Sequence, residues 1–515
     1  MLKMRNLIML SVLLTGSLAL NAQKVTQYTT TEKSPWVTGK TALATKALGT
    51  VVAAVDGNEK GVAFRAWGTT FNELDWDAFS MLSRDDQDEV MRNLFAKDGD
   101  LRFTHGRVSM NANDYARSWY SCDDVVGDLG LKHFNIERDK RNIIPLARAA
   151  QKYCPQLQLF MSPWSPPTWM KINQDYCVLS SPYNTQSKEK DYLLFSLTPA
   201  PSSKGEGGTD DSEVSVDPDE MKLLGEREGV FPRRLATQDY FIQDPRYLQS
   251  YADMFCHFID LYAEQGLPIT KVMYQNEAYS YTPYPGCAWT AEGTLRFNRD
   301  YLIPTLRQKH PEVETCIGTL NTNRYDYVKL FIDGLKDQVK GVGLQWEGRE
   351  IIDSLRQRYP NLHFIQSESE CGNGSMDWRA GEHTFWLLHE YIGRGCDEYF
   401  IWNFILCDQG QSSWGWRQNA LVQVVSADKT YRYTPEFYAV KHFSHFVEPG
   451  STLVAFQPWT RESGTQSIVF SRPDGKRVVI CGNTNDEEKT ITIQLGQRYL
   501  NATLLPHSFN TFVEK

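Results

Sequence analysis

Two stretches of this chain place a glutamate directly after a short apolar run. In Lys271–Glu277 (KVMYQNE) the apolar residues give way to Gln275, Asn276 and Glu277, and an aromatic, proline-containing loop follows. The second stretch, Leu362–Glu370 (LHFIQSESE), also passes from apolar residues to acids. An apolar run of this length is typical of a parallel strand that is buried on both faces. Because the strands of a parallel barrel end at the same mouth, the two runs predict acids that face one another there.

Eight apolar runs of similar length recur between residues 61 and 433, and helical patterns separate them. This alternation predicts an α/β fold, namely a (β/α)8 TIM barrel over residues 61–433. A chain of 515 residues is long enough for such a barrel and a smaller domain beside it. The predicted barrel strands are Ala63–Thr70, Arg102–Met110, Gln158–Trp164, Lys271–Glu277, Thr315–Leu320, Gly341–Trp346, His363–Glu368 and Tyr399–Phe404.

The sequence changes in character near residue 434. Residues 434–515 contain short alternating runs separated by turn residues, and this pattern predicts an antiparallel β-sandwich. Residues 23–60 contain a lone strand, Val25–Trp36, followed by a linker. We expect this strand to join the sandwich, because a single strand is not stable alone. Residues 187–234 are polar and aperiodic, which predicts a loop inserted between the third and fourth barrel strands.

The first 22 residues have the layout of a secretory signal peptide. Lys3 and Arg5 precede an apolar run, Leu7–Leu14, and a short polar segment then leads to Ala22. This order predicts cleavage after Ala22 and a secreted or periplasmic protein. No later run reaches the ~20 apolar residues that a membrane-spanning helix needs, so we expect no membrane span.

The composition restricts the ligand. Aromatic residues make up 12% of the chain, with 14 Trp and 25 Tyr, and aromatic rings stack on the C–H faces of sugars. A net charge of −9 without a basic cluster argues against binding to nucleic acid. The ten cysteines lack the spacing of metal ligands, so we expect no metal site. One or two disulfides are compatible with export, and the sequence does not pair them.

Polar and aromatic side chains follow most of the predicted strands and are expected to gather at the barrel mouth. One strand-end glutamate is more often a salt-bridge partner or a helix cap than a catalytic group. Carboxylates, amides and indoles on one rim, however, are what pyranoside recognition requires, because they supply hydrogen bonds to hydroxyls and a stacking wall. The residues are Asn111, Asn113, Asp114, Trp164, Trp169, Asn173, Asn276, Glu277, Gln345, Trp346, Glu347, Glu368, Glu370, Trp402 and Asn403.

Several motifs along the barrel make a resemblance specific. They are RVSMNANDY from Arg107, SPWSPPTWMK with an asparagine two residues later, NEAY, NLHFIQSE, and WNF followed by W-x-W-x-x-N, which ends at Asn419. The chain thereby resembles glycoside hydrolase family 30, which includes glucosylceramidases and microbial β-1,6-glucanases. The resemblance implies a barrel with a flanking sandwich, a retaining mechanism with two carboxylates, and neither a metal nor an organic cofactor.

The resemblance also implies roles for individual residues. Glu277 matches the general acid/base, and Glu368 matches the nucleophile. Glu370 stays as the alternative nucleophile, because strand residues two apart face the same side. The residues expected to bind the sugar are Asp114, Trp164, Asn276, Gln345, Trp346, Trp402 and Asn419.

One departure from the family concerns the end of the sixth barrel strand. Many relatives carry His-Trp-Tyr there, whereas this chain has Gln345-Trp346-Glu347. The imidazole and the aromatic hydroxyl that hydrogen-bond the catalytic carboxylates in those relatives are therefore expected to be absent, and with them part of the tuning of the carboxyl pKa values.

The expected function is hydrolysis of β-linked glucosides or β-glucan by double displacement. A β-xylosidase or a β-fucosidase-like specificity on the same scaffold is one alternative, because a single pocket residue can decide the sugar. A non-catalytic glycan-binding protein is another. The pair Glu277 and Glu368 argues against it, since binding alone needs no such pair.

Overall fold

The computed structural model describes residues 24–57, 61–188, 190–191 and 238–515. The chain forms two compact units. The barrel unit comprises Ala66–Leu387 and Arg394–Phe437, and the sandwich unit comprises the chain up to Arg65 together with Leu388–Gly393 and Tyr438–Lys515. The predicted signal peptide and nearly all of the insertion predicted for residues 187–234 lie outside the described residues.

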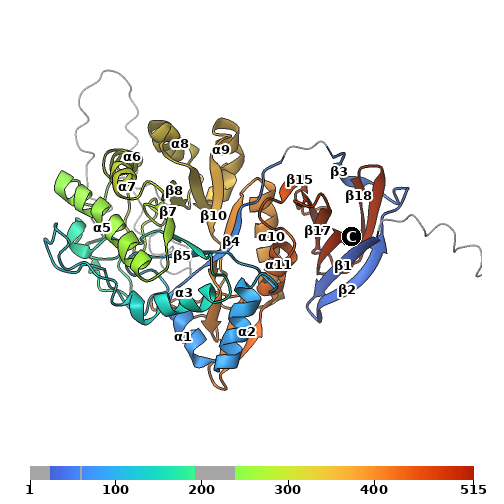
Figure 1. Cartoon of the computed structure of the whole chain (residues 1–515), viewed down its shortest axis with the longest axis horizontal. Coiled ribbons are helices and arrows are strands. Elements are labelled where there is room, and N and C mark those ends of the chain that lie inside the picture. The colour runs from blue at the N-terminus through green and yellow to red at the C-terminus, as the bar shows by residue number, and fades with distance from the viewer. Residues whose placement is uncertain (1–23, 58–60, 189, 192–237) are drawn as a thin grey trace, which may run out of the picture. The chain divides into compact units, whose positions relative to one another are not determined.

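The barrel unit is built on a closed barrel of parallel strands in the order β10-β11-β4-β5-β6-β7-β8-β9 (Figure 1). Each strand overlaps one of the eight predicted runs, so the predicted (β/α)8 barrel is confirmed. The strands are β4 (Ala66–Thr70), β5 (His105–Val108), β6 (Gln158–Met161), β7 (Ile269–Met273), β8 (Glu314–Leu320), β9 (Gly341–Gln345), β10 (His363–Glu368) and β11 (Glu398–Asn403).

The inside of the barrel is a packed apolar core. One buried cluster consists of Phe160, Met273, Cys316, Ile365 and Phe400. The rings of Phe160 and Phe400 meet edge to face with their centroids 4.7 Å apart. A glycine leaves room for this contact, because a Cβ at Gly68 would lie 2.5 Å from the Phe400 ring. With the interior filled in this way, a ligand site belongs at the carboxyl ends of the strands.

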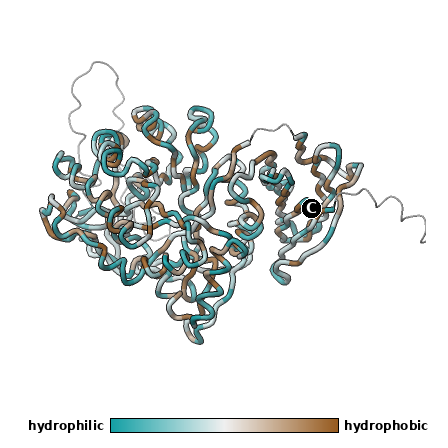
Figure 2. Tube along the Cα trace, in the orientation of Figure 1, coloured by the Kyte–Doolittle hydropathy of each residue, from teal (hydrophilic) through white to brown (hydrophobic). Residues whose placement is uncertain are grey.

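Helices of the barrel unit are amphipathic, as α5 (Pro245–Glu264) illustrates. The Asp244 side chain accepts the N–H of Arg246, and Pro245 fits the first turn, where no N–H is needed. Buried residues recur every three or four positions along α5, and Figure 2 shows hydrophobic and hydrophilic residues interspersed along it. The other α-helices among the described residues are α1 (Glu73–Met81), α2 (Arg84–Phe95), α3 (Ile143–Gln151), α6 (Ala291–Phe297), α7 (Ile303–Lys309), α8 (Tyr325–Leu335), α9 (Ile352–Arg358), α10 (Trp378–Gly393) and α11 (Pro435–Ser444).

A small sheet follows the last barrel strand. β12 (Ile405–Cys407) begins two residues after β11 and pairs in parallel with β13 (Val422–Val425), which forms a hairpin with β14 (Thr430–Tyr433). The loop between β12 and β13 carries Trp416 and Asn419, so the sheet fixes both ends of a segment that was expected to bind sugar.

The sandwich unit contains two sheets. The larger sheet has the order β15-β16-β17-β20-β1-β2 with antiparallel neighbours, and the smaller has the order β19-β18-β3. Apolar residues of both sheets, among them Val25, Ile493 and Phe512, form one core, which confirms the predicted sandwich. The strands are β1 (Lys24–Thr31), β2 (Ser34–Ala42), β3 (Val51–Val55), β15 (Thr452–Gln457), β16 (Thr465–Ser471), β17 (Arg477–Asn483), β18 (Lys489–Leu495), β19 (Arg498–Leu504) and β20 (Ser508–Glu514).

The N-terminal residues form three strands where the sequence predicts one. A turn at Glu32-Lys33 divides the predicted strand Val25–Trp36, so β1 and β2 form a hairpin. The predicted linker contributes β3, which pairs with β18 in parallel. The other strand pairs of the sandwich are antiparallel. The five residues of β3, VVAAV, are uniformly small and apolar, so they show no alternation that would reveal a strand.

All ten cysteines lie in the described part of the chain as free thiols, so no disulfide links them; nine are buried and Cys407 is partly exposed. Cys256, Cys316 and Cys481 pack as small core residues. Across the described residues, we find no helix with the length and apolarity that crossing a membrane demands.

A buried ion pair lies at the amino-terminal end of the barrel strands. The Lys271 Nζ is 2.5 Å from Glu398 Oε2 and 3.7 Å from Glu314 Oε1, and the Lys271 and Glu398 side chains are buried. Burial alone would lower the pKa of Lys271, but Glu398, Cys316 and Glu314 together outweigh burial and raise that pKa. We therefore expect Lys271→Met to destabilise the barrel by about 3–5 kcal/mol, because it removes the cation that compensates the buried charge of Glu398.

Urea unfolding followed by tryptophan fluorescence measures this loss. The double variant Lys271→Met/Glu398→Leu removes both charges and is expected to recover most of the stability. A single variant as stable as the unchanged protein would show that the pair does not hold these strands together.

Candidate active site

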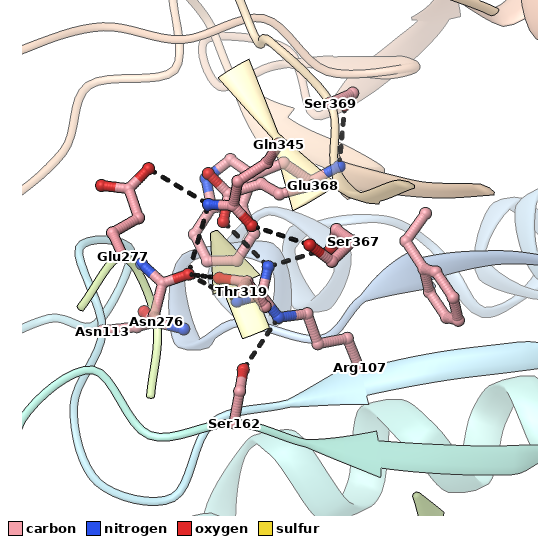
Figure 3. A network of polar contacts seen from close by, with 12 residues as sticks. Arg107, Asn113, Ser162, Asn276, Glu277, Thr319, Gln345, Ser367, Glu368 and Ser369 are labelled. Atoms are coloured by element: carbon pink, nitrogen blue, oxygen red, sulfur yellow. Dashed lines mark hydrogen bonds and ion pairs between the residues drawn. The ribbon is translucent and has the colours of Figure 1, made fainter. Parts of the chain in front are cut away.

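The two predicted acids come from strand ends on the same rim of the barrel (Figure 3). Glu368 is the last residue of β10, and Glu277 lies four residues beyond the end of β7. Both side chains are buried. The sequence predicted that β7 extends to Glu277, but the strand ends at Met273, so Glu277 stands in the loop above the barrel.

Arg107 in β5 is the centre of the site (Figure 3). Its guanidinium is fully buried and donates from Nη1 to Glu368 Oε2 at 2.8 Å and to the Ser367 carbonyl at 3.0 Å. The Nη2 group donates to Asn276 Oδ1 at 2.7 Å, and Nε donates to Ser162 Oγ at 3.0 Å. Arg107 therefore joins the ends of β5, β6 and β10 and the segment after β7 in one network.

Asn276 is the second junction of this network. Besides Arg107, its Oδ1 accepts hydrogen bonds from Thr319 Oγ1 at 2.6 Å and from Gln345 Nε2 at 3.3 Å. The amide oxygen is thus occupied by three donors. Asn276 can therefore bind a ligand through its amide N–H groups, which can donate hydrogen bonds to the oxygen of a sugar hydroxyl.

Both carboxylate oxygens of Glu277 accept a hydrogen bond. Gln345 Nε2 is 3.1 Å from Oε1, and the Tyr284 hydroxyl is 2.7 Å from Oε2. An aromatic hydroxyl therefore reaches Glu277 although, as expected, the end of β9 supplies none. Tyr284, from the loop after β7, supplies the hydroxyl that the end of β9 lacks.

Two residues of the rim have backbone conformations that side chains rarely adopt. Glu277 has φ of +47° and Trp346 has φ of +49°. Such conformations cost on the order of 1 kcal/mol or more each and persist where the surroundings fix them. Glu277 is held in this way, because its N–H donates to the Thr319 carbonyl at 2.9 Å. The strain thus coincides with residues whose side chains were predicted to act on the sugar.

Glu368 has a different electrostatic environment. Burial raises the pKa of Glu368 to about 7, the charge of Glu277 adds to the rise, and Arg107 opposes it. The Trp346 indole also donates to Glu368 Oε1, at 3.4 Å. Because the guanidinium contacts Glu368 directly, its charge favours the ionised form of Glu368.

Glu370 lies two residues further along but is not part of the Arg107 network. Its Oε1 is 3.3 Å from Arg349 Nη1, and its Oε2 is 3.0 Å from His383 Nε2. The contacts of Glu370 are thus those of an ion pair at the rim.

The other expected sugar-binding residues form a wall with unused polar atoms. Trp164 and Trp402 stack with their ring centroids 5.1 Å apart, and Arg107 lies 4.3 Å above the Trp164 ring. Among the described residues, the Nε1 groups of both tryptophans and Oδ1 of Asp114 are buried without a hydrogen-bond partner. Buried polar atoms in native proteins are nearly always paired, so these three are suited to bind hydroxyls of a ligand. Burial and the charges of Glu368 and Glu277 raise the pKa of Asp114.

Asn419 has a structural task in the same region. Its Oδ1 accepts the N–H groups of Gly374 at 2.7 Å and of Met376 at 3.3 Å, which fixes the loop after β10. Burial raises the pKa of the nearby Glu436 to about 8. The Asn419 oxygen is committed to this loop, and the predicted contact of Asn419 with a sugar stays a prediction.

Sequence reasoning missed Arg107 and Tyr284. Arg107 had a detectable signal, because an arginine inside an apolar strand must be paired when it is buried. Tyr284 had none: it lies seven residues beyond Glu277, in a loop whose path no periodicity predicts. Among the residues that the structure describes, no group of three or more His, Cys, Asp or Glu is arranged to hold a metal ion.

The Arg107 network gives a direct prediction. Lysine keeps the charge but cannot make the four contacts of the guanidinium, so Arg107→Lys should leave Glu368 poorly oriented. We expect kcat/KM on an aryl β-glucoside to fall about 100-fold or more, as when one preorganised stabilising group is removed. Arg349→Lys, beside Glu370, serves as the control and should change kcat/KM by less than about threefold. Equal losses in the two variants would contradict the central place of Arg107.

Comparison with known proteins shows the family. The model of the glycosyl hydrolase family 30 TIM-barrel domain matches residues 64–189 and 240–447, and that of the family 30 beta sandwich domain matches residues 450–512. The lysosomal acid glucosylceramidase of Mus musculus is 24% identical over 441 residues, covering 80% of this chain and 73% of that protein.

Two solved structures share the fold. SrfJ from Salmonella typhimurium superimposes with a TM-score of 0.77 at 19% identity, covering 96% of this chain and 99% of that one. An endo-beta1,6-glucanase superimposes with a TM-score of 0.72 at 19% identity, covering 95% and 99%. Since the barrel model alone matches more than half of the chain, the protein belongs to glycoside hydrolase family 30 and is a glycoside hydrolase.

Proposed function

We propose that the protein is an exported retaining β-glycosidase that hydrolyses β-linked glucosides or β-glucan. The observation that carries the proposal is the pair of buried carboxylates, Glu277 and Glu368, in one network with Arg107 and Asn276. The unpaired buried atoms of Asp114, Trp164 and Trp402 support a site for a ligand rich in hydroxyls. Export rests on the signal peptide predicted for residues 1–22.

The chemistry is double displacement. In the first step Glu277 protonates the glycosidic oxygen while Glu368 attacks the anomeric carbon, so that the leaving group departs and a glycosyl ester forms. In the second step Glu277 removes a proton from water, which attacks the same carbon and releases Glu368. Arg107 suits the attacking role of Glu368, because its charge favours the ionised carboxylate that a nucleophile needs.

The relatives support the choice of sugar. The mouse relative is named as a glucosylceramidase and one structural neighbour as an endo-beta1,6-glucanase. Both names refer to glucose, and the second also names a β-1,6 linkage, which favours β-linked glucose over xylose or fucose. The same relatives favour catalysis over simple glycan binding, and the Glu277–Gln345 and Glu368–Arg107 contacts agree with that choice.

The test compares substrates side by side. Chromogenic β-glucoside, β-xyloside and β-fucoside are incubated with the protein together with β-1,6-glucan. We expect the β-glucoside or the glucan to be cleaved fastest, and proton NMR of the first product to show the β-anomer. A first product with the α-configuration would contradict retention, and faster cleavage of the xyloside or fucoside would contradict the sugar. Cleavage of no substrate would favour the glycan-binding alternative.

The acid/base assignment has its own variant in the same assay. Glu277→Gln should lose hydrolysis of the glucan but keep much of the first step on an aryl glucoside with a good leaving group, which needs little protonation. Azide should restore turnover and give a β-glycosyl azide, because this anion needs no base. The control is Glu350→Gln, because the Glu350 carboxylate is exposed and accepts a hydrogen bond from Asn323. This variant should behave as the wild-type protein.

A further inference from the structure

Tyr284 contacts the carboxylate that the proposed function uses as acid and base. Its hydroxyl donates to Glu277 Oε2 at 2.7 Å, while Gln345 donates to Oε1. Gln345 is fully buried, and its own Oε1 accepts a hydrogen bond from Ser367 Oγ at 2.9 Å. The two oxygens of Glu277 therefore have different neighbours: a fixed amide on Oε1 and a phenol on Oε2.

The loop that carries Tyr284 is held firmly on both sides of the ring. Asn184 Nδ2 donates to the Pro283 carbonyl at 2.8 Å, and the buried Lys171 Nζ donates to the Gly286 carbonyl at 2.7 Å. Pro283 and Pro285 flank the tyrosine and restrict its backbone further. The ring itself meets Trp416 edge to face, with centroids 5.1 Å apart at an interplanar angle of 65°. The hydroxyl is thus preorganised at Glu277 before any ligand arrives.

The position of the hydroxyl matters at the moment of proton transfer. When Glu277 gives its proton to the glycosidic oxygen, the bond from that oxygen to the anomeric carbon breaks and Glu277 becomes a carboxylate. A donor already aimed at this carboxylate stabilises the developing charge without reorganising. Tyr284 keeps its own proton throughout, since burial, and next the charge of Glu277, raise its pKa well above the usual value.

We propose that Tyr284 is a positioning residue that assists Glu277 as the general acid by hydrogen-bonding the carboxylate left behind by proton transfer. The inference rests on the proposed function. Its signature is selectivity for the leaving group. The hydroxyl matters for a linkage that must be protonated to break, and it is irrelevant for one that breaks without protonation.

The experiment measures kcat/KM of Tyr284→Phe on two substrates, because kcat/KM reports the first chemical step from free enzyme and free substrate. On a β-1,6-linked gluco-oligosaccharide, whose leaving group is a sugar alcohol, we expect a loss of about 10- to 100-fold, the size of a lost hydrogen bond to a charged group. On 2,4-dinitrophenyl β-glucoside, whose leaving group needs no proton, we expect a change of less than about threefold.

The control is Tyr183→Phe, which removes a hydroxyl from an exposed rim tyrosine and should leave both values unchanged. Thermal unfolding of each variant checks the fold.

If Tyr284→Phe does not fold, Gln345→Met removes the donor to the other oxygen of Glu277 and should show the same dependence on the leaving group. Equal losses on the two substrates would mean that Tyr284 only maintains the shape of the site, and no loss on either would mean that its hydroxyl is idle. Either result overturns the inference.

The same experiment distinguishes a failure of the Tyr284 role from a failure of the proposed function. If the wild-type protein cleaves neither substrate, the proposed function is refuted. An unchanged protein that cleaves both, beside a Tyr284→Phe variant without leaving-group dependence, refutes the role of Tyr284 alone.

Discussion

A single buried guanidinium, that of Arg107, joins the parts of the barrel that make the site. Removing such a group from water costs on the order of several kcal/mol, and only good geometry with complete hydrogen bonding repays it. Arg107 meets both conditions, since Glu368, Ser367, Asn276 and Ser162 accept its protons and the Trp164 ring covers its face. Burial lowers the pKa of Arg107 and the charge of Glu368 opposes this, so each ion depends on the other.

This dependence ties the fold to the chemistry. The partners of Arg107 come from the ends of β6 and β10 and from the segment after β7, so these strands must be in register before the network is complete. The same contacts place Glu368 and Asn276 and, through Gln345, Glu277. A barrel that is slightly open at this rim would lose the network and the orientation of both carboxylates together. The positive φ of Glu277 and Trp346 fits this view, because strained residues persist only where their surroundings determine them.

The fold was predictable from the sequence to the extent that apolar periodicity reports it. Runs such as Gly341–Gln345 are buried throughout and stand out between helical patterns, so all eight barrel strands could be found. The parallel strand β3 could not be found, because VVAAV does not alternate and its partner, β18, is more than 400 residues away. Pairing over such a separation depends on tertiary structure and leaves no local signal.

Site residues that lie at the end of a strand could be predicted from the sequence. A residue that reaches the site only through the path of a loop could not. Glu277, Asn276 and Glu368 stand at or just beyond strand ends and lie together as the sequence indicated. Tyr284 reaches Glu277 only because Lys171 and Asn184 fix the course of its loop. Glu370 shows the limit of periodicity, since residues two apart on a strand share a side and only the contacts distinguish them.

The central claim is that the carboxylate bound to Arg107, Glu368, is the one that attacks the sugar. A 2-deoxy-2-fluoro β-glucoside with a good leaving group slows the second displacement and lets the covalent intermediate accumulate. Mass spectrometry of the intact protein and of its peptides then locates the label. The account predicts one glycosyl group per chain, attached to Glu368. A label on Glu370, or no label under conditions in which the unchanged substrate is turned over, would contradict it.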